Sequence, residues 1–133
     1  MANKKRMGIF ALMLLIVSFV HFHGSASANE QDVQRELMLY NSLKITVVSE
    51  ETCYEWEYEN PNHFEYEKGK RVVKGTEAKE KVVEVLEMLR FSQGPSAEQM
   101  AAYMKQNGFE GIESLKIKML DQDRCLFTWV WNE

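Results

Sequence analysis

The feature that most constrains the fold is a strict alternation of aromatic and acidic residues at positions 54–59, which read Tyr-Glu-Trp-Glu-Tyr-Glu. Successive side chains of a β-strand point to opposite faces of a sheet, so in a strand the rings share one face and the glutamates the other. In a helix both kinds would be spread around the circumference. The run therefore predicts a strand with one face in a hydrophobic core and the other in water.

An earlier run with Leu43, Ile45 and Val47 on one face predicts the neighbouring strand. A tight turn at Glu50-Glu51 brings the two apolar sets together. This turn lacks the glycine or asparagine usual in tight hairpins, so a longer loop with shifted pairing stays open. The predicted pairs are Val47 with Tyr54 and Ile45 with Trp56.

The segment Asn60-Pro61-Asn62 predicts a three-residue hairpin loop, because proline fixes one φ angle and asparagine tolerates a left-handed position. The predicted pairs across it are Tyr58 with Phe64, Trp56 with Tyr66, Glu57 with Glu65, Glu55 with Glu67, and Glu59 with His63. Like charges directly opposite each other are unfavourable, so we expect this acidic face to be solvated, occupied by a cation, or neutralised by basic residues. The candidate neutralising residues are Lys68, Lys70, Arg71 and Lys74.

A further hairpin at Lys68-Gly69 is predicted to place Val73 beside Phe64, and two amphipathic helices follow it. The first runs from Thr76, as its cap, to about Phe91. The second covers about 97–107 and begins with a capping box.

After Gly111 the period of two returns, and a loop at Asp121-Gln122-Asp123 joins the last two predicted strands. The predicted pairs are Met119 with Cys125, Ile117 with Phe127 and Leu115 with Trp129. This register directs Cys125 into the core.

The first 28 residues have the order of a secretory signal peptide. Basic residues at 4–6 precede an apolar run from Ile9 to Val20, and Ala26-Ser27-Ala28 supplies the small residues of a cleavage site. As a helix the apolar run would be about 18 Å long, short of the roughly 30 Å hydrocarbon core of a bilayer. We therefore predict export with cleavage after Ala28 and no stable membrane span afterwards; an uncleaved N-terminal anchor is the alternative.

The net charge narrows the class of partner. The whole chain has 16 basic and 20 acidic residues; without the predicted signal peptide it has 13 basic and 20 acidic residues and a formal charge of −7. A nucleic-acid-binding protein needs an excess of basic over acidic residues. The charge either keeps a small protein soluble or steers a cationic partner such as a basic protein surface, a polyamine or a metal ion.

Cys53 and Cys125 are the two cysteines. An even number in an exported protein suggests one disulfide. The alternation of side chains along the strands argues against this disulfide. Cys125 is predicted to point into the core, whereas Cys53, next to the inward-facing Tyr54, is predicted to point to the acidic face. The bond would then need a bulge or twist near Thr52.

Few residues are candidates for chemistry, and no motif for a cofactor is present. His63, the only histidine after the predicted signal peptide, could act with Glu59 or another neighbouring glutamate as the general base and acid of a small extracellular hydrolase. No nucleophile or oxyanion element accompanies it, so a solvated histidine beside a loop is the simpler interpretation.

Two further kinds of site are conceivable on the predicted sheet. A hard cation such as calcium could bind carboxylates of the acidic face, although a flat sheet seldom offers six converging oxygens. The candidate ligands are Glu55, Glu57, Glu65 and Glu67. The tryptophans could form a carbohydrate-stacking platform, but alternation places them on the face that the helices cover, which favours core packing. They are Trp56, Trp129 and Trp131.

The order of these elements resembles a known family. A predicted leader, the Tyr-Glu-Trp-Glu-Tyr-Glu strand, a Lys-Gly hairpin before a long helix, a second short helix and a terminal hairpin with an Asp-rich turn are similar to the small exported YusW-like proteins of Gram-positive bacteria. The similarity covers about Ile45 to Trp131, and the sequence departs from it in its two cysteines and its Trp-rich end. The family has no established activity, so the resemblance implies location and fold only.

Together these patterns predict a signal peptide at 1–28, a leader or linker at 29–42 and a single α+β domain at 43–133. We expect a two-layer domain with a mostly antiparallel sheet of five or six strands and two helices packed on one face. The expected function is that of a secreted or cell-surface, non-enzymatic binding module whose acidic face meets a cationic protein or a cell-wall component. A small hydrolase and a cation-binding module are the alternatives.

Overall fold

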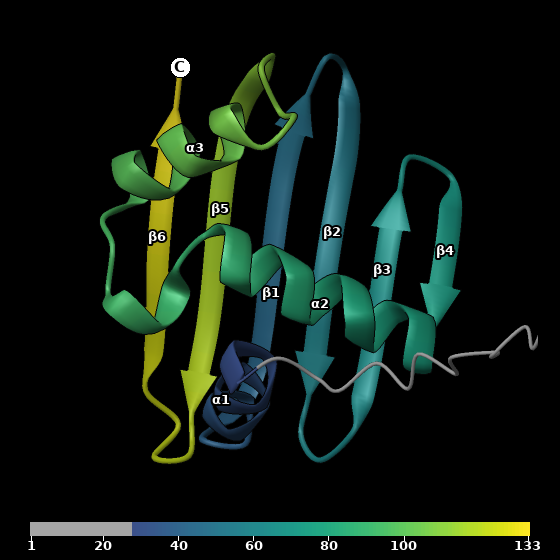
Figure 1. Cartoon of the computed structure of the whole chain (residues 1–133), viewed down its shortest axis with the longest axis vertical. Coiled ribbons are helices and arrows are strands. Elements are labelled where there is room, and N and C mark those ends of the chain that lie inside the picture. Colours follow the sequence, from purple (N-terminus) through teal and green to yellow (C-terminus); the bar gives the residue numbers. More distant parts are fainter. Residues whose placement is uncertain (1–27) are drawn as a thin grey trace, which may run out of the picture.

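A computed structural model describes residues 28–133, which form a six-stranded antiparallel sheet with its helices on one side (Figure 1). Along the sheet the strands follow the order β4-β3-β2-β1-β5-β6. The strands are β1 (Tyr40–Ser49), β2 (Thr52–Glu59), β3 (His63–Lys68), β4 (Arg71–Lys74), β5 (Ile112–Asp121) and β6 (Leu126–Asn132). The helices are α1 (Ala28–Leu37), α2 (Thr76–Met88), the 3-10 helix η1 (Phe91–Gln93) and α3 (Ala97–Gln106). The predicted two-layer α+β architecture is confirmed.

The central registers are those that the alternating residues predict. Val47 lies opposite Tyr54 and Ile45 opposite Trp56 across β1 and β2. All five predicted pairs across β2 and β3 are also present, from Glu59 with His63 to Glu55 with Glu67. Because a shift of one residue would move every ring of β2 to the wet face, the hydrophobic pattern specifies this register strongly.

The β1–β2 turn is as tight as predicted, although both of its residues are glutamates. Glu50 and Glu51 have φ angles of 49° and 61°, in the left-handed region that glycine or asparagine usually occupies. The β5 side of the molecule supports this turn: the Glu50 N–H donates to the Gly111 carbonyl at 3.2 Å, and the Glu51 N–H donates to the Glu113 carboxylate at 3.2 Å. A Cβ atom on Gly111 would lie 2.6 Å from Cγ of Glu50, so a larger residue there would have to displace the Glu50 side chain.

Two hairpins differ from their predicted registers by two residues. The β5–β6 loop has three residues as predicted, but they are 122–124, so Met119 lies opposite Phe127 and not Cys125. Arg124 takes the left-handed position that closes such a loop, with φ of 65°, and the Asp121 carboxylate accepts the Cys125 N–H at 2.8 Å. The other predicted pairs shift likewise, to Ile117 with Trp129 and Leu115 with Trp131.

The β3–β4 turn lies one residue later than predicted. Gly69, with φ of 57°, is its first residue, and Lys68 lies opposite Arg71. Val73 therefore faces Tyr66 and not Phe64. Register errors of two residues leave every side chain on its predicted face, so the fold survives them.

The compact unit begins earlier than the sequence pattern predicts. Residues 29–42, expected to be a leader or linker, contain nearly all of α1 and the start of β1. Val33 and Leu37 of α1 are buried in the core, and α1 packs against α2. The predicted signal peptide lies outside the described residues except for Ala28, the first residue of α1.

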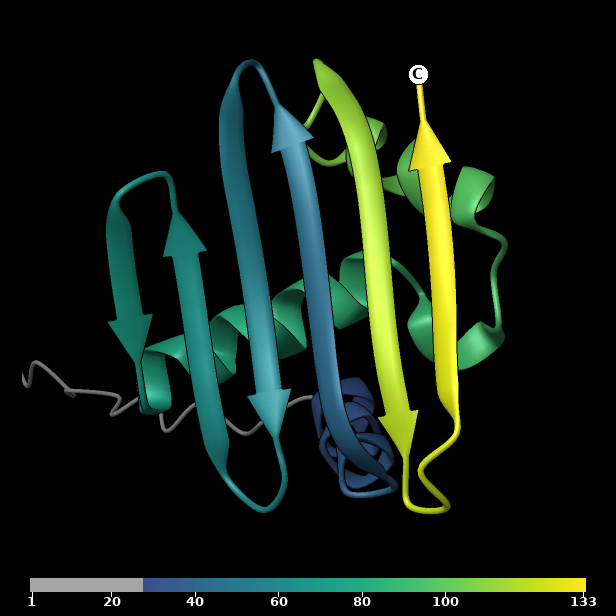
Figure 2. The same cartoon turned by 180° about the vertical axis from the view of Figure 1, so that it is seen from behind.

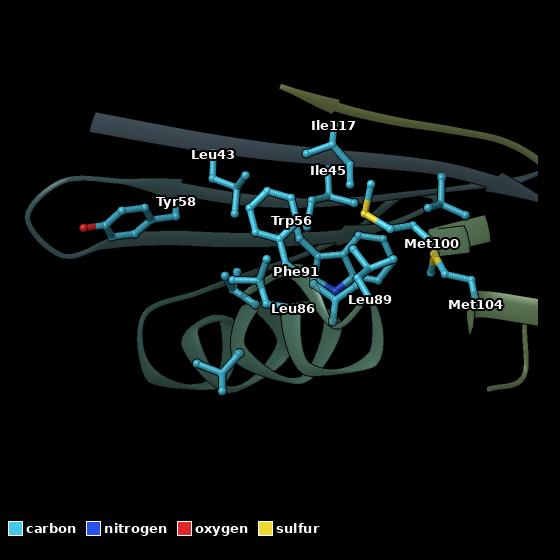
Figure 3. Packing of buried hydrophobic residues seen from close by; sticks show 14 of the residues in the cluster. Leu43, Ile45, Trp56, Tyr58, Leu86, Leu89, Phe91, Met100, Met104 and Ile117 are labelled. Atoms are coloured by element: carbon cyan, nitrogen blue, oxygen red, sulfur yellow. The ribbon is translucent and has the colours of Figure 1, made fainter. Parts of the chain in front are cut away.

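The core lies between the helices and one face of the sheet, here called the helix face (Figure 3). Trp56 of β2, only 4 % exposed, lies between the sheet and α2, near Leu86 and Leu89. The completely buried large side chains include Leu43, Ile45, Tyr58, Leu89, Met100, Met104, Leu115 and Ile117. Both predicted helices are confirmed; Ser96 and Gln99 make the capping box of α3, whereas Gly75, not Thr76, is the N-cap of α2.

Candidate functional site: the open face of the sheet

None of the helices in residues 28–133 covers the second face of the sheet, here called the open face (Figure 2). Because side chains alternate along a strand, the chain neighbours of the buried residues point to the open face. From β4 to β6, one row across this face reads Lys74, Glu65, Glu57, Lys44, Lys118 and Thr128, and the next reads Val72, Glu67, Glu55, Thr46, Lys116 and Val130. Charged side chains thus fill the middle of the open face.

Glutamates of β2 and β3 form an acidic patch on this face, as their register predicts. The patch consists of Glu55, Glu57, Glu59, Glu65 and Glu67. Lysines border it on both sides, Lys74 on β4 and Lys44 on β1. Beyond Lys44, the neighbouring Lys116 and Lys118 of β5 extend a basic strip, so the open face has two halves of opposite charge.

Lys44 is the main cation of the acidic patch. Its Nζ lies 2.9 Å from the Glu55 carboxylate and also forms an ion pair with Glu57. The hydrogen bond with Glu57 raises the pKa of Lys44 well above its ordinary value, more than partial burial lowers it. Sequence reasoning did not name this lysine, although the predicted pair of Ile45 with Trp56 already implies that Lys44 faces Glu57.

One of the expected neutralising residues on β3 and β4 does contact the patch. Lys74 Nζ lies 2.7 Å from the Glu65 carboxylate, and this bond lowers the pKa of Glu65. Arg71 pairs with Glu77 of α2 at 3.2 Å instead. Lys68 lies on the helix face, 5.4 Å from the ring centre of Tyr54.

The pKa of Glu67 indicates that the lysines do not neutralise all the negative charge of the acidic patch. Its pKa is raised, first by the hydrogen bond with the Glu65 carboxyl, then by desolvation and the negative charge of Glu55. A carboxyl that shares a proton with a neighbour releases it reluctantly, because two adjacent negative charges repel each other. The acidic patch therefore keeps a negative potential that an additional cation would relieve.

A shallow depression lies where the two halves of the open face meet. Its volume is about 260 Å³. Glu57 and Glu59 line one side, and Lys44 and Lys118 line the other. In this depression both signs of charge are within reach of one bound group.

The candidate catalytic pair lies on the surface, at the end of a hairpin. His63 and Glu59 lie opposite each other at the end of the β2–β3 hairpin, and both side chains are exposed. In the described part of the chain the imidazole makes no hydrogen bond or ion pair with a carboxylate. The geometry thus gives the histidine no oriented partner.

The candidate metal ligands point to the same face but are not arranged around one point. Within residues 28–133, no group of three or more histidine, cysteine or acidic side chains is placed to hold a metal ion. The Lys44 ammonium group lies between Glu55 and Glu57, where a cation would otherwise contact both.

The structure does not bring together the two cysteines of the predicted disulfide. Cys53 lies opposite Val48 near one end of β1, whereas Cys125 lies beside Asp121, which pairs with Tyr40 at the other end. Eight residues of extended chain separate these ends by roughly 26 Å, and bridged cysteines need Cα atoms within about 7 Å. Both thiols are exposed and unbridged, and Cys125 does not point into the core.

The tryptophans pack against the core rather than forming a flat platform. Trp129 meets Phe91 edge-on, with 5.4 Å between ring centres, and the Lys105 ammonium lies 4.9 Å from the ring centre of Trp131. Trp56 is buried under α2.

No family model matches the chain, and no curated protein or solved structure matches it significantly. The resemblance to YusW-like proteins therefore stays a prediction. Of the helices between residues 28 and 133, none combines the length and apolarity needed to cross a membrane.

Proposed function

We propose that this protein is an exported, non-enzymatic binding module that holds a cationic partner on its acidic patch. The partner would be a basic protein surface or a positively charged cell-wall component. The observation that carries the proposal is the β2–β3 register, which gathers more glutamates on one face than the neighbouring lysines can pair with; the raised pKa of Glu67 agrees with it. Five glutamates there face two lysines, Lys44 and Lys74.

The sheet supplies the rigidity that such a site needs. The glutamates stand on two hydrogen-bonded strands whose other face is locked into the core by Trp56 and Tyr58. A partner therefore meets charges already held in place, which lowers the entropic cost of binding. Charge also accelerates the encounter, so binding should weaken steeply as salt rises.

The test is co-purification from a cell-surface extract with a matched pair of charge reversals. Glu57→Lys alters the acidic patch, whereas Glu98→Lys makes the same change of charge on an exposed position of α3. We expect the wild type and Glu98→Lys to retain one partner that is released by salt, and Glu57→Lys to lose most of it. Circular dichroism must show that both variants are folded.

A defined probe makes the test quantitative. A lysine-rich peptide should shift the NMR signals of residues 55–67 and leave those of α3 unchanged. Equal retention of the partner by both variants would contradict the proposal. Loss of a hydrolytic activity in His63→Ala would contradict it too, and would establish the hydrolase in its place.

A further inference from the structure

The outer edge of β6 is an unprotected pairing surface. No other described element lies beyond β6 in the sheet. Its residues 126–132 read Leu-Phe-Thr-Trp-Val-Trp-Asn, without charge, proline or a break in register. Leu126, Phe127 and Val130 are 61 %, 44 % and 54 % exposed. Natural edge strands usually carry charges, proline or bulges that prevent pairing with another chain, and β6 has none of these.

The backbone groups that are open to pairing can be assigned from the two ends of the β5–β6 ladder. Asp121 N–H donates to Cys125 C=O at 3.1 Å, and Glu133 N–H donates to Glu113 C=O at 3.0 Å. Hydrogen-bonded pairs alternate along an antiparallel ladder, so the odd-numbered residues of β6 bond to β5. The N–H and C=O groups of Leu126, Thr128 and Val130 therefore point outward.

The opposite edge of the sheet is built differently. β4 has four residues and begins with Arg71 and ends with Lys74. A short strand with a cation at each end is a poor template for another strand. Of the two edges, β6 is the one suited to pairing.

We propose that β6 pairs with β6 of a second copy of this chain, antiparallel about a two-fold axis, to continue the sheet from one copy into the next. The strand is self-complementary when the axis passes at Thr128. On the open face Leu126 of each copy then lies opposite Val130 of the other, and on the helix face Phe127 lies opposite Trp129. All outward-pointing backbone groups from 126 to 130 meet outward-pointing groups, as an isologous interface requires.

The distribution of charge agrees with a second copy as the occupant. On the open face, Lys118 of β5 would lie three strand spacings from its counterpart, about 14 Å, and Lys116 would lie farther from its own, so physiological salt screens both pairs. In Figure 1, α3 lies in front of the C-terminal end of β6, and η1 crosses its N-terminal half, where Phe91 contacts Trp129. An axis at Thr128 carries the second α3 to the opposite end of the paired strands.

The matched test uses two valines on opposite edges. Val130 and Val72 both point to the open face from an edge strand, and they are 54 % and 49 % exposed. Lysine at either position adds the same charge, but only Val130→Lys places two ammonium groups against the apolar side chains of a β6–β6 pair. Light scattering after gel filtration gives the mass, with reductant present so that exposed Cys53 and Cys125 cannot join copies.

We expect the wild type and Val72→Lys to be dimers at about 100 μM and Val130→Lys to be a folded monomer, a twofold drop in mass. Hydrogen exchange at the Leu126, Thr128 and Val130 amides should also slow as the wild-type concentration rises. A monomeric wild type would overturn the proposal, as would equal effects of the two variants or a dimer that reductant removes.

Discussion

The two faces of the sheet are made by the same strands, yet the side chains on each face have different roles. On the helix face, Ile45, Trp56 and Ile117 are excluded from water by α2 and α3. On the open face, their chain neighbours Lys44 and Glu57 stay in contact with solvent and bind each other. Apolar burial is worth more than a solvent-exposed ion pair, so the helix face supplies stability, while the open face can vary and serve recognition.

The largest expected effect is the loss of a buried side chain on the helix face. Ile117→Ala leaves a cavity beneath the helices and should lower the free energy of unfolding by about 3 kcal/mol. Lys118→Ala, one residue later on the open face, should change it by less than about 0.5 kcal/mol. Urea denaturation measures both; similar losses would show that the two faces do not differ as described.

The second prediction concerns a polar atom on the helix face. Among buried side-chain polar atoms of the described residues, the Tyr58 hydroxyl has no hydrogen-bond partner, and burial raises its pKa. In Figure 3 this hydroxyl points away from the rest of the cluster. Tyr58→Phe removes the unpaired group and keeps the ring, so we expect a gain of about 1 kcal/mol in urea denaturation. A loss of that size would show that the hydroxyl is bonded.

The third prediction tests the ion pairs of the open face. Lys44→Met keeps the aliphatic stem but leaves Glu55 and Glu57 without their cation, and should cost about 1 kcal/mol or less at low salt. In about 1 M salt the loss should nearly vanish, because exposed charges are screened. A loss that does not depend on salt would show that Lys44 acts by packing.

The smallest effect is a dependence of stability on pH in the acidic patch. Glu67 has a raised pKa, so its contribution to stability is lost as pH rises through that pKa; Glu65 has a lowered pKa, and its contribution is lost as pH falls. Glu67→Gln should therefore raise the melting temperature slightly at pH 7 and have no benefit at pH 3. Carboxyl NMR titration of the wild type should give a higher midpoint for Glu67 than for Glu65, and the reverse order would contradict this assignment.

The sequence predicted the faces of the strands better than the positions of their ends. Alternation specifies the faces of β1 to β3, because a slip of one residue would expose the rings of β2, and the tight turn and the proline loop select among the remaining registers. In the β5–β6 hairpin either of two three-residue loops keeps the same faces, and the left-handed Arg124 selects between them. The alternation of side chains shows only which face of the sheet a residue lies on. It could not show that Cys53 and Cys125 lie at opposite ends of the sheet.

Some parts of the candidate site could be predicted from the sequence and others could not. The acidic patch follows from the β2–β3 register, and Lys44 follows from the β1–β2 register. The place of β5 next to β1, which brings Lys116 and Lys118 to the patch, depends on a long connection through two helices that no local pattern specifies. The burial of α1 was missed because its few apolar residues, such as Val33 and Leu37, give a weak helical pattern.

The Glu50-Glu51 turn has a consequence for how the chain folds. Its two amides are held by Gly111 and Glu113, about sixty residues further along. Two glutamates with positive φ cost free energy that the β1–β2 pairs must offset, so the hairpin should be less stable before β5 arrives. The N-terminal half of the domain is thus dependent on the C-terminal half, and the native state should form and melt as one cooperative unit.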